Sequence, residues 1–330
     1  MRALHLDQGK QLKFVEATMP EVGPDEVLVK IKAAALNHRE LWITKGLYPG
    51  MRLPCILGAD GAGMIHDTGS DVDPKLKGKE VIIYPGRSWG PKQSAPDKAF
   101  RVLGMPDAGT FAEYISVHKD LVFPKPSHFS WEEAAAIPVA GLTAWRALYY
   151  YGNIQSGDKV LITGIGGGVA QIGLTLALSF GAEVYVTSSS PDKIQKAIKR
   201  GAKAGVNYKD FDWPDQLKEL AGTIDLVLDS SPREVFDGYF RFLQRGAKVI
   251  AYGSQGSRKT TINISKFFLR HIQFIGTAMG SPEDFKNLLN YIEEQKLTPT
   301  IHSTYPFEET IEALKFLEAG NQIGKVIVQF

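Results

Sequence analysis

The feature that most constrains the fold is a glycine cluster between a strand-like and a helix-like segment. Val160–Thr163 is a short run of aliphatic and β-branched residues. Gly164 and Gly166–Gly168 follow it, and a segment without charge continues to Ala182. The segment is long enough for a membrane helix, but glycines near its start would disrupt one. They suit a strand that turns tightly into a helix, so the pattern predicts a βα unit.

Further strand-like runs follow at 184–187, 226–228 and 248–251, with helix-like segments after the first two. Continuous apolar strands are typical of a parallel sheet covered on both faces, and right-handed crossovers make such a sheet doubly wound. We therefore expect an α/β chain with a Rossmann fold. A last strand is expected at 274–276, followed by a helix from about Pro282.

The amino-terminal part has a different residue pattern. Short strand candidates at 27–31, 63–65 and 81–84 are separated by glycine and proline. This predicts a mainly β domain, a partly open barrel, as far as about Val122. Ser130 and Glu133 then form a capping-box pattern that predicts a helix start, and the strand-like tail 326–328 is expected to return to the first domain. A length of 330 residues favours two domains.

Charge and cysteine content exclude several classes of protein. The chain has 38 basic and 36 acidic residues, a net charge of +2, and no charged run that would serve as a nucleic-acid-binding arm. Its one cysteine, Cys55, excludes an intramolecular disulfide and a zinc site built from cysteines. Asp7 and Lys10 interrupt the amino terminus before a signal-peptide core can form. We expect a cytoplasmic protein that acts on a small molecule, without nucleic-acid or membrane partners.

The glycine cluster predicts a dinucleotide site. Glycines let the backbone approach a pyrophosphate, whose charge is met by amides at a helix start. In the register where Gly167 is the central glycine, Ile165 replaces the first glycine of the usual motif and Ala170 is the permitted final small residue. The motif is therefore imperfect. The expected contacts are Gly166, Gly167, Gly168 and Val169.

The end of the second strand indicates which nucleotide is bound. NAD sites usually carry an acidic residue there for the ribose hydroxyls, and this chain has none. Instead Thr187, Ser188, Ser189 and Ser190 follow, with Lys193 one helical turn later. Hydroxyls and a cation suit a 2′-phosphate, which favours NADP(H) over NAD(H). The alternative is that the serines cap a helix and Lys193 is solvated, and the two readings are compatible.

Five segments of the chain carry distinctive motifs: Ala35–Trp42, Gly46–Pro49, Leu57–Gly63, Ala134–Pro138 and Gly141–Trp145. Together these motifs resemble the medium-chain dehydrogenase/reductase family. They occur in the family's order along essentially the whole chain, and they continue through Gly201–Ala202 and 206–208 to 324–326. The resemblance implies a GroES-like catalytic domain, 1–123 with 279–330, around a Rossmann domain, 124–278. It also implies a homodimer joined through the sheet edge at 273–277.

The zinc enzymes of this family have ligands that this chain lacks. A cysteine of theirs corresponds to Asn37, and a histidine followed by an acid corresponds to Ala59 and Asp60. The first three cysteines of their structural-zinc lobe correspond to Trp89, Lys92 and Ala95, so no zinc is expected at either position. His38 and His66 are possible substitute ligands, but a lone histidine is more often structural.

Hydride transfer without a Lewis acid suits substrates already polarised by conjugation. The resemblance is therefore to the zinc-free quinone-reductase branch, in which an asparagine and two aromatic residues line the pocket. They correspond to Asn37, Trp42 and Tyr48 here. Trp42 replaces a usual tyrosine, which leaves Tyr48 as the better candidate for donating a proton or orienting the substrate. For both aromatic residues the alternative is core packing.

By the same resemblance, Thr143 contacts the nicotinamide, and Lys193 with Tyr208 brackets the 2′-phosphate. Loop residues Gly253 and Ser254 lie near the cofactor in relatives, as do Asn321 and Lys325 in the tail, although a surface role for Lys325 is an alternative. We expect a zinc-independent, NADPH-dependent reductase of quinones, α,β-unsaturated carbonyls or related electrophiles. The alternatives are an alcohol or aldehyde dehydrogenase of the same family and a non-catalytic NADPH-binding redox sensor.

Overall fold

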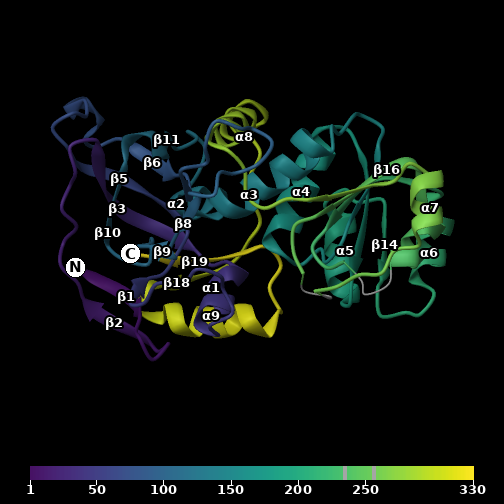
Figure 1. The fold of residues 1–330 in the computed structure, drawn as a ribbon, viewed down its shortest axis with the longest axis horizontal. Coiled ribbons are helices and arrows are strands. Elements are labelled where there is room, and N and C mark those ends of the chain that lie inside the picture. Colours follow the sequence, from purple (N-terminus) through teal and green to yellow (C-terminus); the bar gives the residue numbers. More distant parts are fainter. Residues whose placement is uncertain (233–235, 255–257) are drawn as a thin grey trace. The chain divides into compact units, whose positions relative to one another are not determined.

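The structure is a computed structural model that describes residues 1–232, 236–254 and 258–330. It divides into two compact units, Met1–Ala140 with Ser281–Phe330, and Gly141–Gly280. Figure 1 shows the first unit in purple, blue and yellow, and the second in teal and green. Within the described residues, no helix is long and apolar enough to cross a membrane.

The first unit is mainly β, as expected. Its largest sheet has the order β11-β6-β5-β3-β19-β18, with β10 also paired to β3. Two small sheets have the orders β2-β1-β4 and β7-β8-β9. The strands are β1 (Arg2–Leu6), β2 (Leu12–Glu16), β3 (Glu26–Ala35), β4 (Cys55–Ile56), β5 (Asp60–Thr68), β6 (Glu80–Ile83), β7 (Gly86–Arg87), β8 (Arg101–Leu103), β9 (Pro106–Asp107), β10 (Tyr114–His118), β11 (Val122–Pro124), β18 (Ile301–Pro306) and β19 (Lys325–Gln329).

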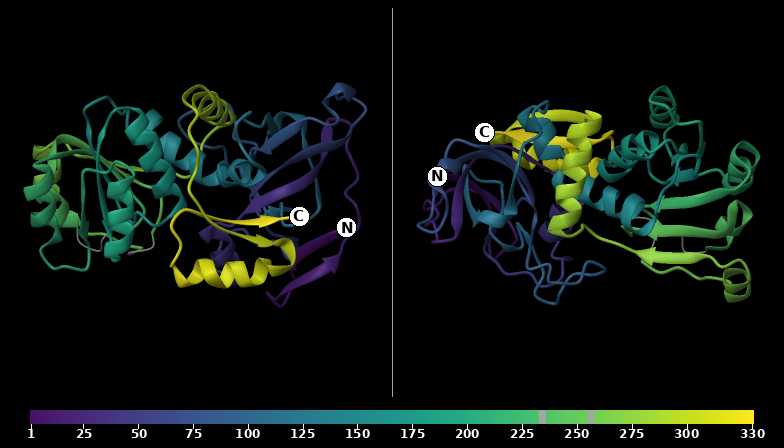
Figure 2. Two further views of the ribbon diagram at one scale, coloured as in Figure 1. Left: turned by 180° about the vertical axis from the view of Figure 1, so that it is seen from behind. Right: turned by 90° about the horizontal axis from the view of Figure 1, so that it is seen from above.

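The carboxy-terminal tail completes this unit. β19 pairs antiparallel with β3 and parallel with β18, which confirms that the tail strand returns to the first domain. Figure 2 shows β18 and β19 in yellow, with α9 beside them. The helices are α1 (His38–Thr44), α2 (Trp131–Ala136), α8 (Pro282–Gln295) and α9 (Thr310–Ala319), with 3-10 turns at Pro74–Leu76, Lys119–Leu121 and Phe307–Glu309.

Two helix starts were correctly predicted from local sequence. At α2, Ser130 Oγ accepts from Glu133 N at 3.2 Å, and Glu133 Oε2 accepts from Ser130 N at 2.8 Å. Both orphan amides are satisfied by the box. At α8, Pro282 occupies the first turn, and Ser281 and Asp284 form a similar reciprocal pair.

The second unit is a doubly wound parallel sheet with the strand order β14-β13-β12-β15-β16-β17. Chain order reverses at β12, which pairs with both β13 and β15. Such a switch point is where nucleotides bind in open α/β sheets, at the carboxyl ends of the strands. The strands are β12 (Lys159–Ile162), β13 (Glu183–Ser188), β14 (Ala204–Asn207), β15 (Ile224–Asp229), β16 (Leu243–Ala251) and β17 (Gln273–Gly276).

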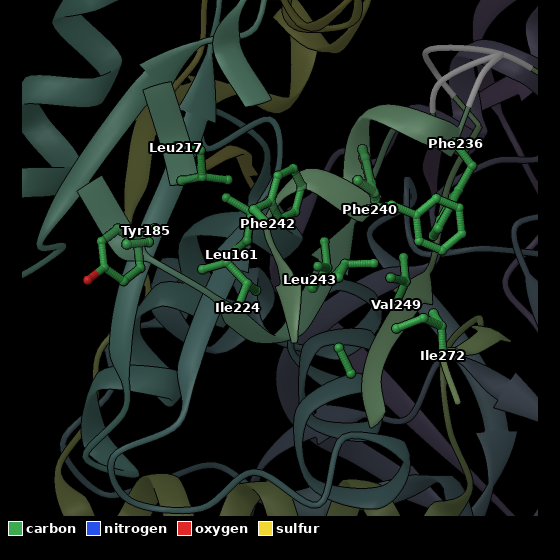
Figure 3. Packing of buried hydrophobic residues seen from close by; sticks show 14 of the residues in the cluster. Leu161, Tyr185, Leu217, Ile224, Phe236, Phe240, Phe242, Leu243, Val249 and Ile272 are labelled. Atoms are coloured by element: carbon green, nitrogen blue, oxygen red, sulfur yellow. The ribbon is translucent and has the colours of Figure 1, made fainter. Parts of the chain in front are cut away.

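Helices flank this sheet (Figures 1 and 2). The segment near Phe236, expected to be helical, forms a 3-10 helix over Phe236–Arg241. Its aromatic side chains pack with Leu161, Phe242 and Val249 in a buried cluster (Figure 3). The α-helices are α4 (Gly168–Ser179), α5 (Pro191–Lys199), α6 (Trp213–Ala221) and α7 (Ile264–Leu269).

The division between the units differs from the expected one at residues 123 and 124. It lies between Ala140 and Gly141, within α3 (Pro138–Trp145), which a π-helical turn, Arg146–Tyr151, follows. The reason is packing: α2 lies against β3, β5 and β19. The change in residue pattern after Pro124 marks the end of the amino-terminal strands, but the first unit continues to Ala140.

Candidate active site

A buried ion pair lies in the first unit. Lys325 on β19 and Asp60 on β5 have side chains only 3% and 0% exposed, and their charged groups are 2.9 Å apart. Lys325 Nζ also donates to Asn37 Oδ1 at 2.6 Å and to Leu36 O at 2.8 Å. These three acceptors use all three N–H groups of the ammonium. Lys325 is therefore neither on the surface nor available to donate to a phosphate in this arrangement.

The Asp60 carboxylate connects three elements. Oδ2 accepts from Lys325 and, at 2.9 Å, from Asn37 Nδ2. Oδ1 accepts from Val139 N at 2.8 Å, in the first turn of α3. The Asp60 backbone carbonyl accepts from Thr110 Oγ1 at 2.7 Å. Asn37, the residue that precedes α1, is thus held by both partners of the ion pair.

A second pair of charges lies beside the first. Glu40 is fully buried, and its carboxylate accepts from Asn37 N at 2.6 Å and lies 3.3 Å from the Arg39 guanidinium. Burial raises the pKa of Glu40 to about 7; nearby Asp60 also raises it, whereas Arg39 and Lys325 lower it. Burial, with a smaller effect of Lys325, lowers the pKa of His38 to about 4. Burial and nearby charges together therefore determine the pKa values of His38 and Glu40.

The two expected pocket aromatics lie close to this segment in sequence. Trp42 is half-buried on α1, and Leu47 N donates to its carbonyl as the chain leaves the helix. Tyr48 is half-buried, and the Arg39 guanidinium lies 4.9 Å from the centre of its ring. A cation over a phenol ring is favourable and orients the ring. Arg39 thus connects Tyr48 to the segment 37–40, which Asp60 and Lys325 hold through Asn37.

The donor set around Asn37 and Asp60 does not fit zinc. Their side-chain oxygens already accept from the Lys325 ammonium, whose charge would repel a metal ion. Across residues 1–232, 236–254 and 258–330, no three His, Cys, Asp or Glu side chains gather as metal ligands would. At the structural-zinc position, Trp89 Nε1 donates to Lys92 O at 3.0 Å, and the indole packs edge-on against Phe100.

In the second unit, the glycine loop joins β12 to α4 as expected. Gly164 has φ +62°, and a Cβ there would lie 2.7 Å from Ser230 Oγ, so this position requires glycine. Ile165 N donates to Thr187 O on β13, and Gly167 precedes the first turn of α4. The amides of a first helical turn lack partners within the helix and suit an anion. The expected contacts Gly166, Gly167, Gly168 and Val169 all lie in this loop or turn.

The structure brings together residues at the end of β13. Ser188 Oγ accepts from Ser190 N at 3.1 Å, and Ser188 O accepts from Tyr208 N at 3.2 Å. Ser190 Oγ accepts from Lys193 N, so the serine caps α5, and Ser189 is half-buried beside it. Burial lowers the pKa of Lys193; Lys196 also lowers it, whereas Asp192 raises it. The helix-cap reading is confirmed for Ser190 and leaves the phosphate reading of Lys193 open.

A hydroxyl cluster at the switch point was missed by the sequence reasoning. Thr163 Oγ1 donates to Asp229 Oδ1 at 2.8 Å and accepts from Ser230 N at 2.9 Å. Tyr239 donates to the other Asp229 oxygen at 2.9 Å. Asp229 is fully buried and comes 66 residues after Thr163, so only the parallel pairing of β12 with β15 reveals their proximity.

The remaining expected residues lie on α3, after β16 and in the carboxy-terminal tail. Thr143 on α3 is 5% exposed, and its hydroxyl accepts from Met279 N at 3.1 Å. Gly253 and Ser254 are exposed after β16, and a Cβ at Gly253 would lie 2.7 Å from Ser230 O. Asn321 is exposed in the first unit.

Comparisons with known proteins agree with this architecture. Residues 23–127 match the model of the alcohol dehydrogenase GroES-like domain, and residues 168–294 match that of the zinc-binding dehydrogenases. A zinc-type alcohol dehydrogenase-like protein, YogA, from Leptosphaeria maculans is 33% identical over 96% of this chain and 94% of its own. A quinone oxidoreductase of Mus musculus is 26% identical over 95% and 92%, respectively.

A solved structure has the same fold. The crystal structure of an NAD-dependent alcohol dehydrogenase superposes with a TM-score of 0.93 and 34% identity, and the match covers 100% of both chains. The chain therefore belongs to the medium-chain dehydrogenase/reductase superfamily of oxidoreductases.

Proposed function

We propose that this protein is a zinc-independent, NADPH-dependent reductase of quinones, α,β-unsaturated carbonyls or related electrophiles. The observation that carries the proposal is the commitment of Asn37 and Asp60 to the Lys325 ammonium. With a lysine in place of a metal, this cluster supplies no Lewis acid to polarise a simple alcohol or aldehyde. A conjugated acceptor is already polarised, and the similarity to a quinone oxidoreductase supports this substrate class.

Two features support NADPH as the cofactor. The end of β13 carries Ser188, Ser189 and Ser190 without an acidic residue, and Lys193 lies in the first turn of α5. A cation and hydroxyl donors suit a 2′-phosphate, whereas NAD sites favour a carboxylate there. In this proposal Gly166, Gly167, Gly168 and Val169 hold the pyrophosphate, Tyr208 assists Lys193, and Thr143 orients the nicotinamide.

When bound, the reduced cofactor supplies a hydride to the substrate. In a quinone or enone the hydride leaves an oxyanion or enolate, which then takes one proton. Tyr48 is the chain's candidate for donating that proton or for orienting the carbonyl, since its phenol has an O–H and its ring is held by Arg39. Trp42 supplies an apolar wall, and the oxidised cofactor and reduced substrate are the products.

Tyr48→Phe tests this assignment. We expect kcat for quinone reduction to fall at least tenfold, with the Kd of NADPH unchanged, because only the O–H is removed. Tyr114→Phe, on a strand of the same unit, is the matched control and should leave kcat unchanged. An unchanged kcat in Tyr48→Phe would contradict the role proposed for Tyr48.

We further propose a cytoplasmic homodimer that pairs two copies through β17, the last strand in the sheet order. β17 pairs with β16 on one side, and α7 exposes Ile264, Phe268 and Leu269 by 66%, 59% and 60%. An unpaired strand edge and exposed apolar side chains are both features that favour association with another chain. Light scattering after size exclusion should give twice the mass of the chain, and the monomer mass would contradict the proposal.

A further inference from the structure

The amino terminus of α3 has an unusual source of hydrogen-bond acceptors. The first amides of a helix normally bond to the side chain of the preceding residue. Here Ile137 precedes Pro138; its side chain is aliphatic, and its backbone angles, φ −83° and ψ −46°, are helical. Val139 N donates instead to Asp60 Oδ1, from a residue 79 positions earlier. Asp60 therefore does for α3 what a local cap does in other helices.

The other oxygen of Asp60 acts at a second helix. Asn37 precedes α1, and its side chain bridges Asp60 Oδ2 and Lys325 Nζ. α1 carries Trp42, and α3 carries Thr143, whose hydroxyl bonds to Met279 N. One buried carboxylate thus fixes the starts of two helices. One of them, α1, is expected to carry a substrate contact, and the other, α3, a nicotinamide contact.

We infer that Asp60, held in place by Lys325, is a positioning residue for hydride transfer. Its Oδ1 fixes the first turn of α3, and its Oδ2 fixes Asn37 at the start of α1. This inference rests on the proposed function for its catalytic consequence. Asp60 is fully buried and its oxygens bond within the protein, so it acts through α1 and α3 without touching the substrate.

Two double variants separate the effect of the hydrogen-bond acceptor at position 60 from the effect of its charge. Asp60→Asn with Lys325→Met retains an oxygen for Val139 N, while both charges are gone. The Asn37 amide, no longer held by Lys325, turns over so that its Oδ1 accepts from the new amide N–H. Asp60→Leu with Lys325→Met has a similar shape and no acceptor. We expect kcat in the leucine variant to be at least tenfold below that of the asparagine variant. Asp25→Leu with Lys119→Met, which removes an exposed pair, is the control and should match the wild type.

A structural role alone would not alter the nicotinamide environment, so the second readout is the fluorescence of bound NADPH. We expect the leucine variant to change the emission of the bound nicotinamide and to retain the wild-type affinity for 2′,5′-ADP, which lacks that ring. Equal kcat and equal emission in the two variants would overturn the inference. If no quinone or enone is reduced by the wild type but the emission differs, the proposed function fails and the positioning role stands.

Asp60→Ser with Lys325→Met replaces the leucine variant if the latter does not fold, because a serine hydroxyl is too short to reach Val139 N. If both acceptor-free variants fail to fold while the asparagine variant folds, Asp60 is needed for folding and the positioning role is overturned.

Discussion

The two polar clusters of this protein are built on opposite principles. In the first unit, Asp60, Lys325 and Asn37 are charged or strongly polar, and their side chains are hydrogen-bonded to one another. In the second unit, glycines, hydroxyls and helix-start amides lie at strand ends, with Lys193 half-buried nearby. A cluster whose charges are already paired holds geometry, whereas amides and a cation at a sheet edge suit an anionic ligand. This difference supports a positioning role for the cluster of the first unit and a ligand-binding role for that of the second.

Lys325→Met should have the largest effect on stability. It leaves the Asp60 carboxylate buried without its cation, and breaking one partner of a buried pair typically costs about 3–5 kcal/mol. Denaturant unfolding measures this loss. Lys119→Met, which breaks the exposed pair with Asp25, is the control and should scarcely move the midpoint. Similar midpoints for the two variants would show that the buried cluster does not hold the first unit together.

Lys193→Ala should act on binding and not on stability. We expect it to weaken NADPH by about 1.5–3 kcal/mol and NADH far less, because only the 2′-phosphate pairs with the ammonium. Lys196→Ala removes a neighbouring charge of the same helix, paired with Asp192, and is the control. Fluorescence titration with both nucleotides measures the effect. Equal weakening of NADPH and NADH by Lys193→Ala would contradict the assignment.

Gly164→Ala separates backbone strain from steric blockage. Both Gly164 and Gly78 have positive φ, but a Cβ at Gly78 meets nothing within 4 Å, whereas one at Gly164 meets Ser230 Oγ at 2.7 Å. Each substitution should cost about 1 kcal/mol of stability from strain. Only Gly164→Ala is expected also to weaken NADPH binding, because it displaces the loop. Equal NADPH affinity in both variants would place the nucleotide elsewhere.

Glu40→Gln should have an effect on stability that depends on pH. Because burial raises the pKa of folded Glu40 to about 7, its proton stabilises the fold below pH 4.5, and this stability is lost as the pH rises through 7. Glutamine cannot titrate. The free energy of unfolding of the variant, relative to that of the wild type, should therefore rise by about 2 kcal/mol between pH 5 and 8. His38 titrates in both proteins and cancels. Parallel stability curves against pH would contradict the assignment to Glu40.

Local sequence was sufficient for features made by neighbouring residues. The glycine turn after β12, the cap at Ser130 and the start of α8 each depend on residues within one or two turns, and all were predicted. The pairing of Lys325 with Asp60 was not, since the residues are 265 positions apart and meet only because β19 joins the sheet of β3 and β5. The same applies to Thr163 and Asp229. Long-range pairing explains both the missed network and the shifted domain boundary.

The most direct test is oxidation of NADPH and NADH by protein treated with a metal chelator. The acceptors are 1,4-benzoquinone, 9,10-phenanthrenequinone, a simple enone and an aldehyde. We predict turnover with NADPH in preference to NADH, on a quinone or the enone, without added metal. Turnover that appears only after zinc is restored, or only with NADH and the aldehyde, would contradict the proposed function.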